Sequence, residues 1–235
     1  MKNKTKITGR ILWVDALRGL AIVLMVIFHF CYDLRYFDYV DWDVPNGPNW
    51  RPFRYLILTL FIFTVGMSLS LAHGRGIRWS SFAKRLIQLI LAALAITAMS
   101  LFMFPDGWIY FGILHFIVVA SLFGIALVKV PALAMALGLL ILSGYWLGFF
   151  QAGWPFHLAS EFLPSYTEDF VPLFPWLGVA FFGIGAGRIL PLGKLNAFVI
   201  PGVSYLAFLG RYGLVVYLIH QPLLFAGVFT FGYIF

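Results

Sequence analysis

The chain has 235 residues, of which 62% are hydrophobic and only 11% are charged, whereas soluble domains are about half apolar and a quarter charged. A soluble fold cannot bury that much apolar surface, so the composition excludes a soluble domain. The chain is long enough for about seven membrane spans of ~20 residues. The net charge of +7 does not indicate a nucleic-acid partner, because the basic residues lie in clusters between apolar runs and form no continuous phosphate-binding face.

Apolar runs of helical length follow one another along the whole sequence. They predict spans near 11–32, 55–73, 84–104, 109–128, 131–150, 171–190 and 212–234. The stretch 195–210 is apolar but short, and Pro201 and Gly202 interrupt it, so we expect it to be interfacial or re-entrant. The sequence therefore predicts an all-α, polytopic transmembrane helix bundle, with residues 1–235 forming a single domain. No low-complexity linker divides it.

The first run, 11–32, follows a basic N-terminus, as a signal peptide would. It contains Asp15, Arg18 and His29 and has no small-residue cleavage site, so we expect a retained first helix. The only cysteine, Cys31, has no second cysteine with which to form a disulfide or a thiolate metal site.

The loops between the predicted spans alternate in charge. Basic residues lie before the first span and in loops 74–83 and 191–194, whereas the long loops 33–54 and 151–170 hold most of the acids. The positive-inside rule then predicts a cytosolic N-terminus and an external C-terminus. We expect the two long external loops to cap an outward-facing cavity.

Five ionisable side chains lie inside predicted spans, where each costs about 2.5–3.5 kcal/mol on insertion scales and is a candidate site. They are Asp15, Arg18, His29, His115 and His220. Arg18 and His29 share one face of the first helix, about 16 Å apart along its axis. Counting along the spans predicts an inner layer of Asp15, Arg18 and His220 and an outer layer of His29, His115 and Asp33.

Each candidate also has a structural interpretation. Asp15 and Arg18, three residues apart, can form an ion pair that orders the helix packing. His220 can bond a carbonyl freed by Pro222, and His115 can hydrogen-bond between helices. His29 is the best candidate for a general base, since imidazole titrates near neutral pH. The histidines are poorly spaced for a metal site, so no metal is expected.

Glycines recur in the sixth span, at positions 178, 183, 185 and 187. No strand-to-helix turn accompanies them, so they indicate close helix packing instead of phosphate binding.

Five segments in order carry a family resemblance. They are Val14–Ala21 with Phe28–Phe30, Phe61–Ser68, Phe111–Phe116, Phe174–Gly178 with Gly187-Arg188, and Leu209–Tyr212 continuing to Tyr217–Pro222. The first resembles the first helix of the transmembrane acyltransferase superfamily, in which an Arg or Lys, ten residues and a His form a signature matched by Arg18 and His29. The nearest branch is similar to the bacterial relatives of the heparan-α-glucosaminide N-acetyltransferase family.

The resemblance implies a membrane acyltransferase that moves acetyl, or a similar acyl group, from cytosolic acetyl-CoA to an extracytosolic sugar or glycan amine or hydroxyl. The implied catalytic residues are His29 and His115, acting directly or through an acetyl-histidine. The implied donor-binding residues are Asp15, Arg18, Arg188, Arg211 and His220. The implied partners are acetyl-CoA, the acceptor and the lipid bilayer of a bacterial inner membrane, with a homodimer left open.

The chain departs from the lysosomal enzyme of that family in one respect. That enzyme has an asparagine where His29 stands and a catalytic histidine in the following luminal loop, but loop 33–54 has no histidine. Two other functions remain open. Buried Asp, Arg and His groups are also typical of a transporter, and a non-enzymatic membrane subunit is the third interpretation.

Overall fold

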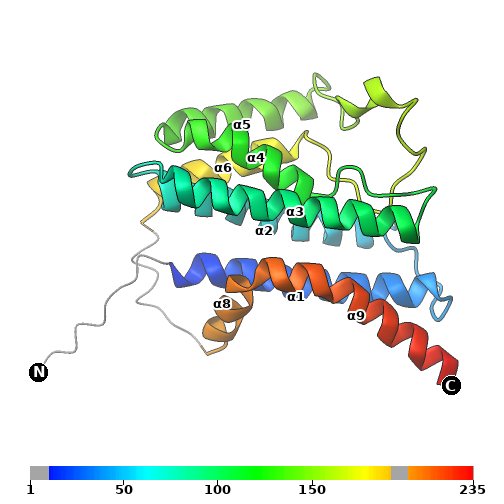
Figure 1. Ribbon diagram of the computed structural model, residues 1–235. Coiled ribbons are helices and arrows are strands. Elements are labelled where there is room, and N and C mark those ends of the chain that lie inside the picture. Colours follow the sequence, from blue (N-terminus) through cyan, green and yellow to red (C-terminus); the bar gives the residue numbers. More distant parts are fainter. Residues whose placement is uncertain (1–10, 192–200, 235) are drawn as a thin grey trace, which may run out of the picture. The chain divides into compact units, whose positions relative to one another are not determined.

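A computed structural model describes residues 11–191 and 201–234. Its helices are α1 (Leu12–Tyr36), α2 (Trp50–His73), α3 (Trp79–Met103), α4 (Ile113–Leu127), α5 (Pro131–Trp146), the 3₁₀ turn η1 (Phe156–Ala159), α6 (Trp176–Ile189), α8 (Val203–Arg211) and α9 (Gly213–Ile234) (Figure 1). In the described residues the only β pairing is an isolated bridge between Phe111 and Phe170. The predicted all-α class is confirmed.

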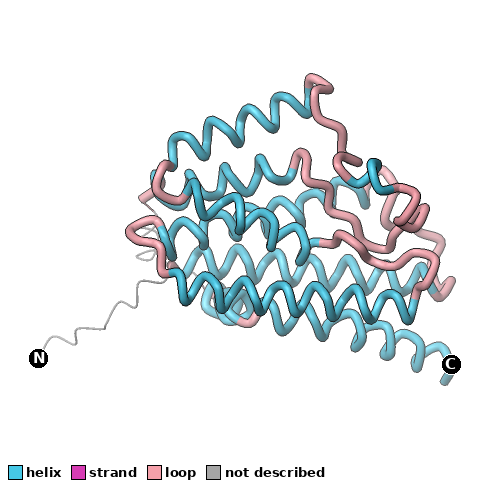
Figure 2. The backbone as a smooth tube through the Cα atoms, turned by 45° about the horizontal axis from the view of Figure 1, so that its top comes forward, coloured by secondary structure: helices cyan, strands magenta, loops and turns pink. Residues whose placement is uncertain are grey.

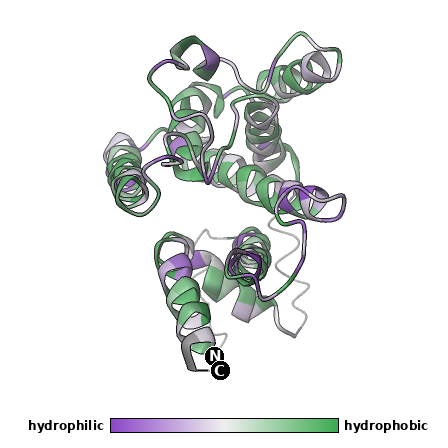
Figure 3. Ribbon diagram, turned by 90° about the vertical axis from the view of Figure 1, so that its right-hand side faces the viewer, coloured by the Kyte–Doolittle hydropathy of each residue, from purple (hydrophilic) through white to green (hydrophobic). Residues whose placement is uncertain are grey.

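Within the described residues, four helices are long and apolar enough to cross a membrane, namely α1, α2, α3 and the Gly213–Gly232 part of α9. The apolar helices α4, α5 and α6 are shorter, with 15, 16 and 14 residues. Hydrophobic residues predominate along these helices (Figure 3), as they do where lipid replaces water around a bundle. A polytopic helical membrane protein accounts for this pattern.

Several helices begin or end away from the predicted limits. α1 continues to Tyr36, which places Asp33 inside the helix. α2 begins at Trp50 and α3 at Trp79, each five residues before the apolar run predicted it. Hydropathy marks the apolar centre of a span, whereas the backbone hydrogen bonding of a helix continues into its polar ends. α5 begins as predicted at Pro131, a favoured first helical residue.

The chain divides into two compact units, and the boundary falls within α2. One unit contains the residues up to Ile57 and from Pro191 onward, and the other contains Leu58–Leu190. The prediction of a single domain stays a prediction.

In the first unit, α8 packs along the beginning of α1. Ala16, Val203 and Ala207 form a buried cluster there, and Gly19 and Gly210 bring the two backbones into contact. A Cβ on Gly19 would overlap the carbonyl of Leu206. With nine residues, or about 13 Å, α8 is too short to span the bilayer, in agreement with the interfacial prediction for 195–210. The part of that stretch before residue 201 lies outside the described residues.

Helix α9 of the first unit runs parallel to α1 (Figure 1). Gly213 at its start lies against Ile22, and the rings of Phe37 and Phe225 further along are 4.8 Å apart. A first and a seventh span must point in the same direction, so the parallel packing agrees with an odd number of crossings.

In the second unit, glycines of α6 allow close helix contacts, as predicted. Gly178 lies against Gly138 of α5, and Gly183 lies against the carbonyl of Phe63 of α2. Gly185 lies against the side chain of Met135 of α5. An added Cβ on Gly178 or Gly183 would meet backbone atoms, which cannot turn aside, so close packing favours glycine there.

The two ends of the second unit differ in charge. Arg188 at the end of α6 lies against Gly74 after α2, near the basic loop 74–83. At the other end, the loop after η1 bonds to the segment before α4, because the Glu168 N–H donates to the Gly107 carbonyl at 3.0 Å. Like the other loops, these two segments are drawn in pink in Figure 2. The predicted separation of basic and acidic loops is therefore present within this unit.

Candidate functional site

Two histidines of the first unit lie together, His29 of α1 and His220 of α9, with ring centroids 4.8 Å apart and planes at 88°. The Nδ1 of His29 is 2.9 Å from the carbonyl oxygen of Met25, and the Nδ1 of His220 is 2.6 Å from that of Tyr217. A carbonyl only accepts hydrogen bonds, so each Nδ1 carries the proton and each Nε2 is left with its lone pair. The Nε2 of each ring can therefore accept a proton.

Asp33 and Gln221 extend this pair on the same two helices. Asp33 is four residues after His29 and shares its helix face. The Gln221 Nε2 donates to the Asp33 Oδ1 at 2.8 Å. Asp33 and His220 are both buried, with exposed fractions of 0% and 7%. We call His29, Asp33, His220 and Gln221 the outer cluster.

The predicted depth of His220 near Arg18 is wrong. The two histidine rings are in contact, and His29 is about 16 Å from Arg18 along the helix. The reason is the register of the two parallel helices. Gly213 packs beside Ile22, and seven residues further along each helix stand His220 and His29.

The sequence suggested that His220 bonds a carbonyl freed by Pro222, and the structure shows a different hydrogen bond. Pro222 has no N–H to pair with the carbonyl four residues earlier, that of Leu218. His220 instead bonds the carbonyl of Tyr217. The ring orientation is therefore set by the preceding turn of α9.

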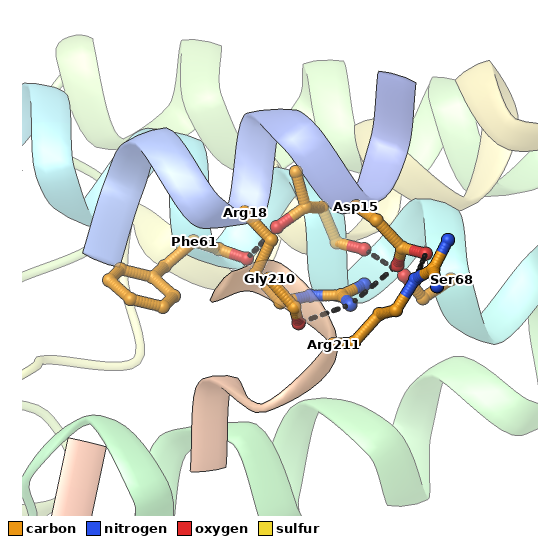
Figure 4. A network of polar contacts seen from close by, with 7 residues as sticks. Asp15, Arg18, Phe61, Ser68, Gly210 and Arg211 are labelled. Atoms are coloured by element: carbon orange, nitrogen blue, oxygen red, sulfur yellow. Dashed lines mark hydrogen bonds and ion pairs between the residues drawn. The ribbon is translucent and has the colours of Figure 1, made fainter. Parts of the chain in front are cut away.

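A second group of charges, the inner cluster, joins α1 to the end of α8 (Figure 4). The Arg18 Nη1 is 3.1 Å from the Asp15 Oδ1 and donates to the Gly210 carbonyl at 3.2 Å. The Arg211 Nε is 3.8 Å from the Asp15 Oδ2. Arg18 is 15% exposed and Arg211 is 46% exposed. The predicted ion pair between Asp15 and Arg18 is present, and Arg211 presents the more accessible cation.

The remaining predicted site residues, Arg188 and His115, belong to the second unit. Arg188 is exposed at the C-terminal end of α6, where a cation is also favoured by the helix dipole.

His115 lies in a hydrogen-bond network between α3 and α4. The Gly112 N–H donates to its Nδ1 at 3.3 Å, so the other ring nitrogen, Nε2, carries the proton and donates to the Thr97 Oγ1 at 3.1 Å. The Thr97 hydroxyl in turn donates to the Ile109 carbonyl at 2.7 Å. Both ring nitrogens are occupied, and this geometry supports the structural interpretation of His115.

Replacing His115 tests that interpretation. We expect His115→Ala to lower the free energy of unfolding by about 1–3 kcal/mol, because buried hydrogen-bonding groups of α3 and α4 lose their partner. Thermal unfolding in detergent would show the loss, and the protein that remains folded should keep its acetyl-transfer rate. A stable His115→Ala protein without transfer activity would instead assign His115 to the chemistry.

The loop before α4 is held by its neighbours in the same unit. The Asp169 carboxylate accepts from the Ile113 N–H at 3.2 Å, which places a negative charge at the N-terminus of α4. Burial raises the pKa of the Tyr110 phenol above its usual value, so the hydroxyl stays protonated at neutral pH. These contacts order the loop next to the His115 network.

A pocket of about 610 Å³ lies at the C-terminal end of α1. Its walls are Tyr32, Arg35, Tyr36, Asp38, Asp41, Trp42, Asp43 and Val44. Arg35 pairs with Asp38 at 3.1 Å, whereas Asp41 and Asp43 have no ion pair within the described part of the chain. The first unit thus combines aromatic faces and carboxylates, with Tyr32 only one helical turn beyond His29.

Across residues 11–191 and 201–234, no group of three or more His, Cys, Asp or Glu side chains could hold a metal ion.

Comparison with known families identifies the chain. The profile of the family described as heparan-alpha-glucosaminide N-acetyltransferase, catalytic, matches residues 10–222. The chain belongs to this family. Neither a curated protein nor a solved structure matches the chain. As a member of the heparan-alpha-glucosaminide N-acetyltransferase family, the protein is a membrane acetyltransferase, and the donor used by the family is acetyl-CoA.

The segment matched by this acetyltransferase family includes both clusters, His115 and Arg188. Sequence reasoning had not assigned Gln221 or its bond to Asp33. One signal was available, since an amide inside an apolar helix needs a hydrogen-bonding partner. The partner itself depends on the register between α1 and α9, which the sequence does not reveal.

Proposed function

We propose that this family member transfers an acetyl or similar acyl group from cytosolic acetyl-CoA across a bacterial inner membrane to an extracytosolic sugar or glycan. In this proposal the N-terminus is cytosolic, the inner cluster lies toward the donor, and the outer cluster lies toward the acceptor. The observation that carries the proposal is the bond from the His29 Nδ1–H to the Met25 carbonyl, which leaves the Nε2 as a proton acceptor about 16 Å along α1 from the cationic inner cluster. A pantetheine arm has to bridge such a distance if the phosphates stay inside.

His29 is the proposed general base. Its Nδ1–H is held by the Met25 carbonyl, so the Nε2 can take a proton from the acceptor. The acceptor atom then attacks the thioester carbonyl, its new bond to carbon forms, and the carbon–sulfur bond breaks. The departing thiolate takes up a proton and leaves as free CoA.

The donor phosphates need cations, and Arg211 supports that role better than Arg18 does. Arg18 is committed to Asp15 and to the Gly210 carbonyl, whereas Arg211 is three times as exposed, at 46% against 15%. We propose that Arg211 binds phosphate and that Arg18 and Asp15 hold the helix end in place.

The two arginines should therefore respond differently to the same substitution. Arg211→Gln is expected to weaken acetyl-CoA binding by about 1.5–3 kcal/mol, because a charged hydrogen bond is lost. Arg18→Gln should mainly lower thermal stability, because it leaves Asp15 buried with less compensation. Titration calorimetry and thermal unfolding of both proteins measure the difference. Equal donor affinity in Arg211→Gln and the parent would contradict the assignment.

The pocket at the outer end of α1 supports the acceptor side of the proposal. The aromatic rings of Tyr32 and Trp42 offer faces for a sugar ring. The carboxylates of Asp41 and Asp43 offer hydrogen-bond acceptors for its hydroxyls. We therefore propose that the body of the acceptor lies in this pocket.

The proposal is tested with purified protein in detergent. Labelled acetyl-CoA and a panel of amino sugars and neutral sugars would be incubated with it, and both free thiol and labelled sugar would be measured. Equal amounts of the two products support transfer. A protein that neither binds acetyl-CoA nor releases thiol would refute the acetyltransferase proposal.

A further inference from the structure

The segment from the end of α5 through η1, residues 146–162, exposes a large apolar surface. Its only Asp, Glu, Lys or Arg is Glu161, and five large apolar side chains in it are between 73% and 86% exposed. They are Trp146, Leu147, Phe149, Leu158 and Phe162. Loops that face water rarely expose apolar side chains in such a group, so this segment indicates an interaction surface.

Other rings of the same segment fix it to the second unit. The Phe156 ring of η1 is 4.4 Å from the Phe111 ring, and the Phe150 ring stacks on the Phe174 ring at 4.5 Å and 14°. Phe150 is thus packed, whereas its neighbour Phe149 is exposed. The segment is held in place through one set of rings, and the exposed set is left for contact with something else.

The length of α5 determines where this segment lies in a membrane. Lys129 stands two residues before α5, so the helix begins close to the headgroups. Its 16 residues rise about 24 Å, whereas the hydrocarbon core is about 30 Å thick, and any tilt lowers the rise further. The chain therefore leaves α5 at Trp146 before it has crossed the whole apolar layer, and it continues from there to η1 (Figure 1).

We propose that residues 146–162 form an aromatic anchor, which inserts into the boundary between acyl chains and headgroups of the bilayer. Aromatic rings favour this boundary, and an irregular backbone is tolerated there because headgroups and water can pair with its polar groups. The anchor also continues the apolar surface of α5, on which Leu139 and Leu140 are 60% and 61% exposed.

Lipid accounts for the observations better than a protein partner does. A second copy of the chain could cover the exposed rings, but it would leave the short α5 unexplained. The bilayer accounts for both, because the anchor fills the part of the apolar layer that α5 does not reach. Part of the predicted external loop 151–170 would then contact lipid. This inference does not depend on acetyl transfer.

Spin labels test the contact directly. Full-length protein with Cys31→Ser and one new cysteine, from Phe149→Cys or Phe162→Cys, would carry a nitroxide in vesicles of phosphatidylcholine and phosphatidylglycerol. Oxygen concentrates in the acyl chains, whereas a polar nickel chelate stays in water, so the ratio of their collision rates with the label reports its surroundings. We expect this ratio to be several-fold higher at both positions than at a water-exposed position of the same unit.

Two further positions of the second unit calibrate the ratio. Leu91→Cys, in the middle of α3 and 61% exposed, is the control for lipid, and Asp106→Cys, exposed in the loop before α4, is the control for water. Thermal unfolding of each labelled protein shows that the fold is kept. A ratio at Phe149 and Phe162 equal to that at Asp106 would place the segment in water and overturn the inference. Labels that neither reagent reaches would show that protein covers the patch, which would overturn it as well.

Discussion

His29→Ala is expected to lower the rate of acetyl transfer by ~10²–10⁴-fold, the usual contribution of a positioned general base. The Nδ1–H of His29 is fixed by the Met25 carbonyl, so the Nε2 is preorganised to receive a proton, and alanine supplies no substitute. Donor affinity should stay at the parental value, because the inner cluster is about 16 Å away along α1. Single-turnover transfer and acetyl-CoA titration on the same preparation would separate chemistry from binding.

His220→Ala is the matched comparison, because its ring lies beside that of His29 on α9. If His29 is the base, His220→Ala should reduce the rate less, because the His29 ring and its bond to the Met25 carbonyl remain. Thermal unfolding of both proteins distinguishes a collapsed bundle from an inactive site. Parental transfer by His29→Ala would show that the base has been misassigned, and a larger loss in His220→Ala would move that role to α9.

The membrane helices could be predicted from the sequence because lipid imposes a simple rule on them. Every backbone group in the apolar layer needs a partner within its own helix, so long apolar runs such as 212–234 have one available structure. The glycines of α6 were predictable for a related reason. Close helix packing in lipid depends on small residues, and Gly183 lies against the backbone of α2 as expected.

The composition of the outer cluster was only partly predictable. Asp33 was expected in the same outer layer as His29, but as part of loop 33–54. Because α1 continues to Tyr36, Asp33 instead lies one helical turn after His29. His220 was assigned to the wrong layer, and Gln221 was not assigned at all. Their positions depend on how far α9 is shifted along α1, and that shift follows from the contact between Gly213 and Ile22. No residue count along a single helix contains such a shift.

Gly210→Ala is expected to have a large effect although it removes no charged group. The new Cβ would overlap the backbone carbonyl of Asp15, which cannot turn aside as a flexible side chain can, so α8 must move away from α1. Such overpacking costs about 1–3 kcal/mol of stability. It should also weaken acetyl-CoA binding, because the Gly210 carbonyl accepts from Arg18 and Arg211 is the next residue.

Gly227→Ala is the control for this substitution, since a Cβ at Gly227 in α9 meets nothing within 4 Å. Alanine favours a helix over glycine by about 1 kcal/mol, so this protein should be as stable as the parent or more so. Thermal unfolding and acetyl-CoA titration of both variants would then show opposite shifts in stability, with donor affinity reduced in Gly210→Ala alone. Gly210→Ala could instead keep the stability and the donor affinity of the parent. The close packing of α8 on α1 would then not be what positions Arg18 and Arg211, and the assignment of the inner cluster to the donor would lose its structural basis.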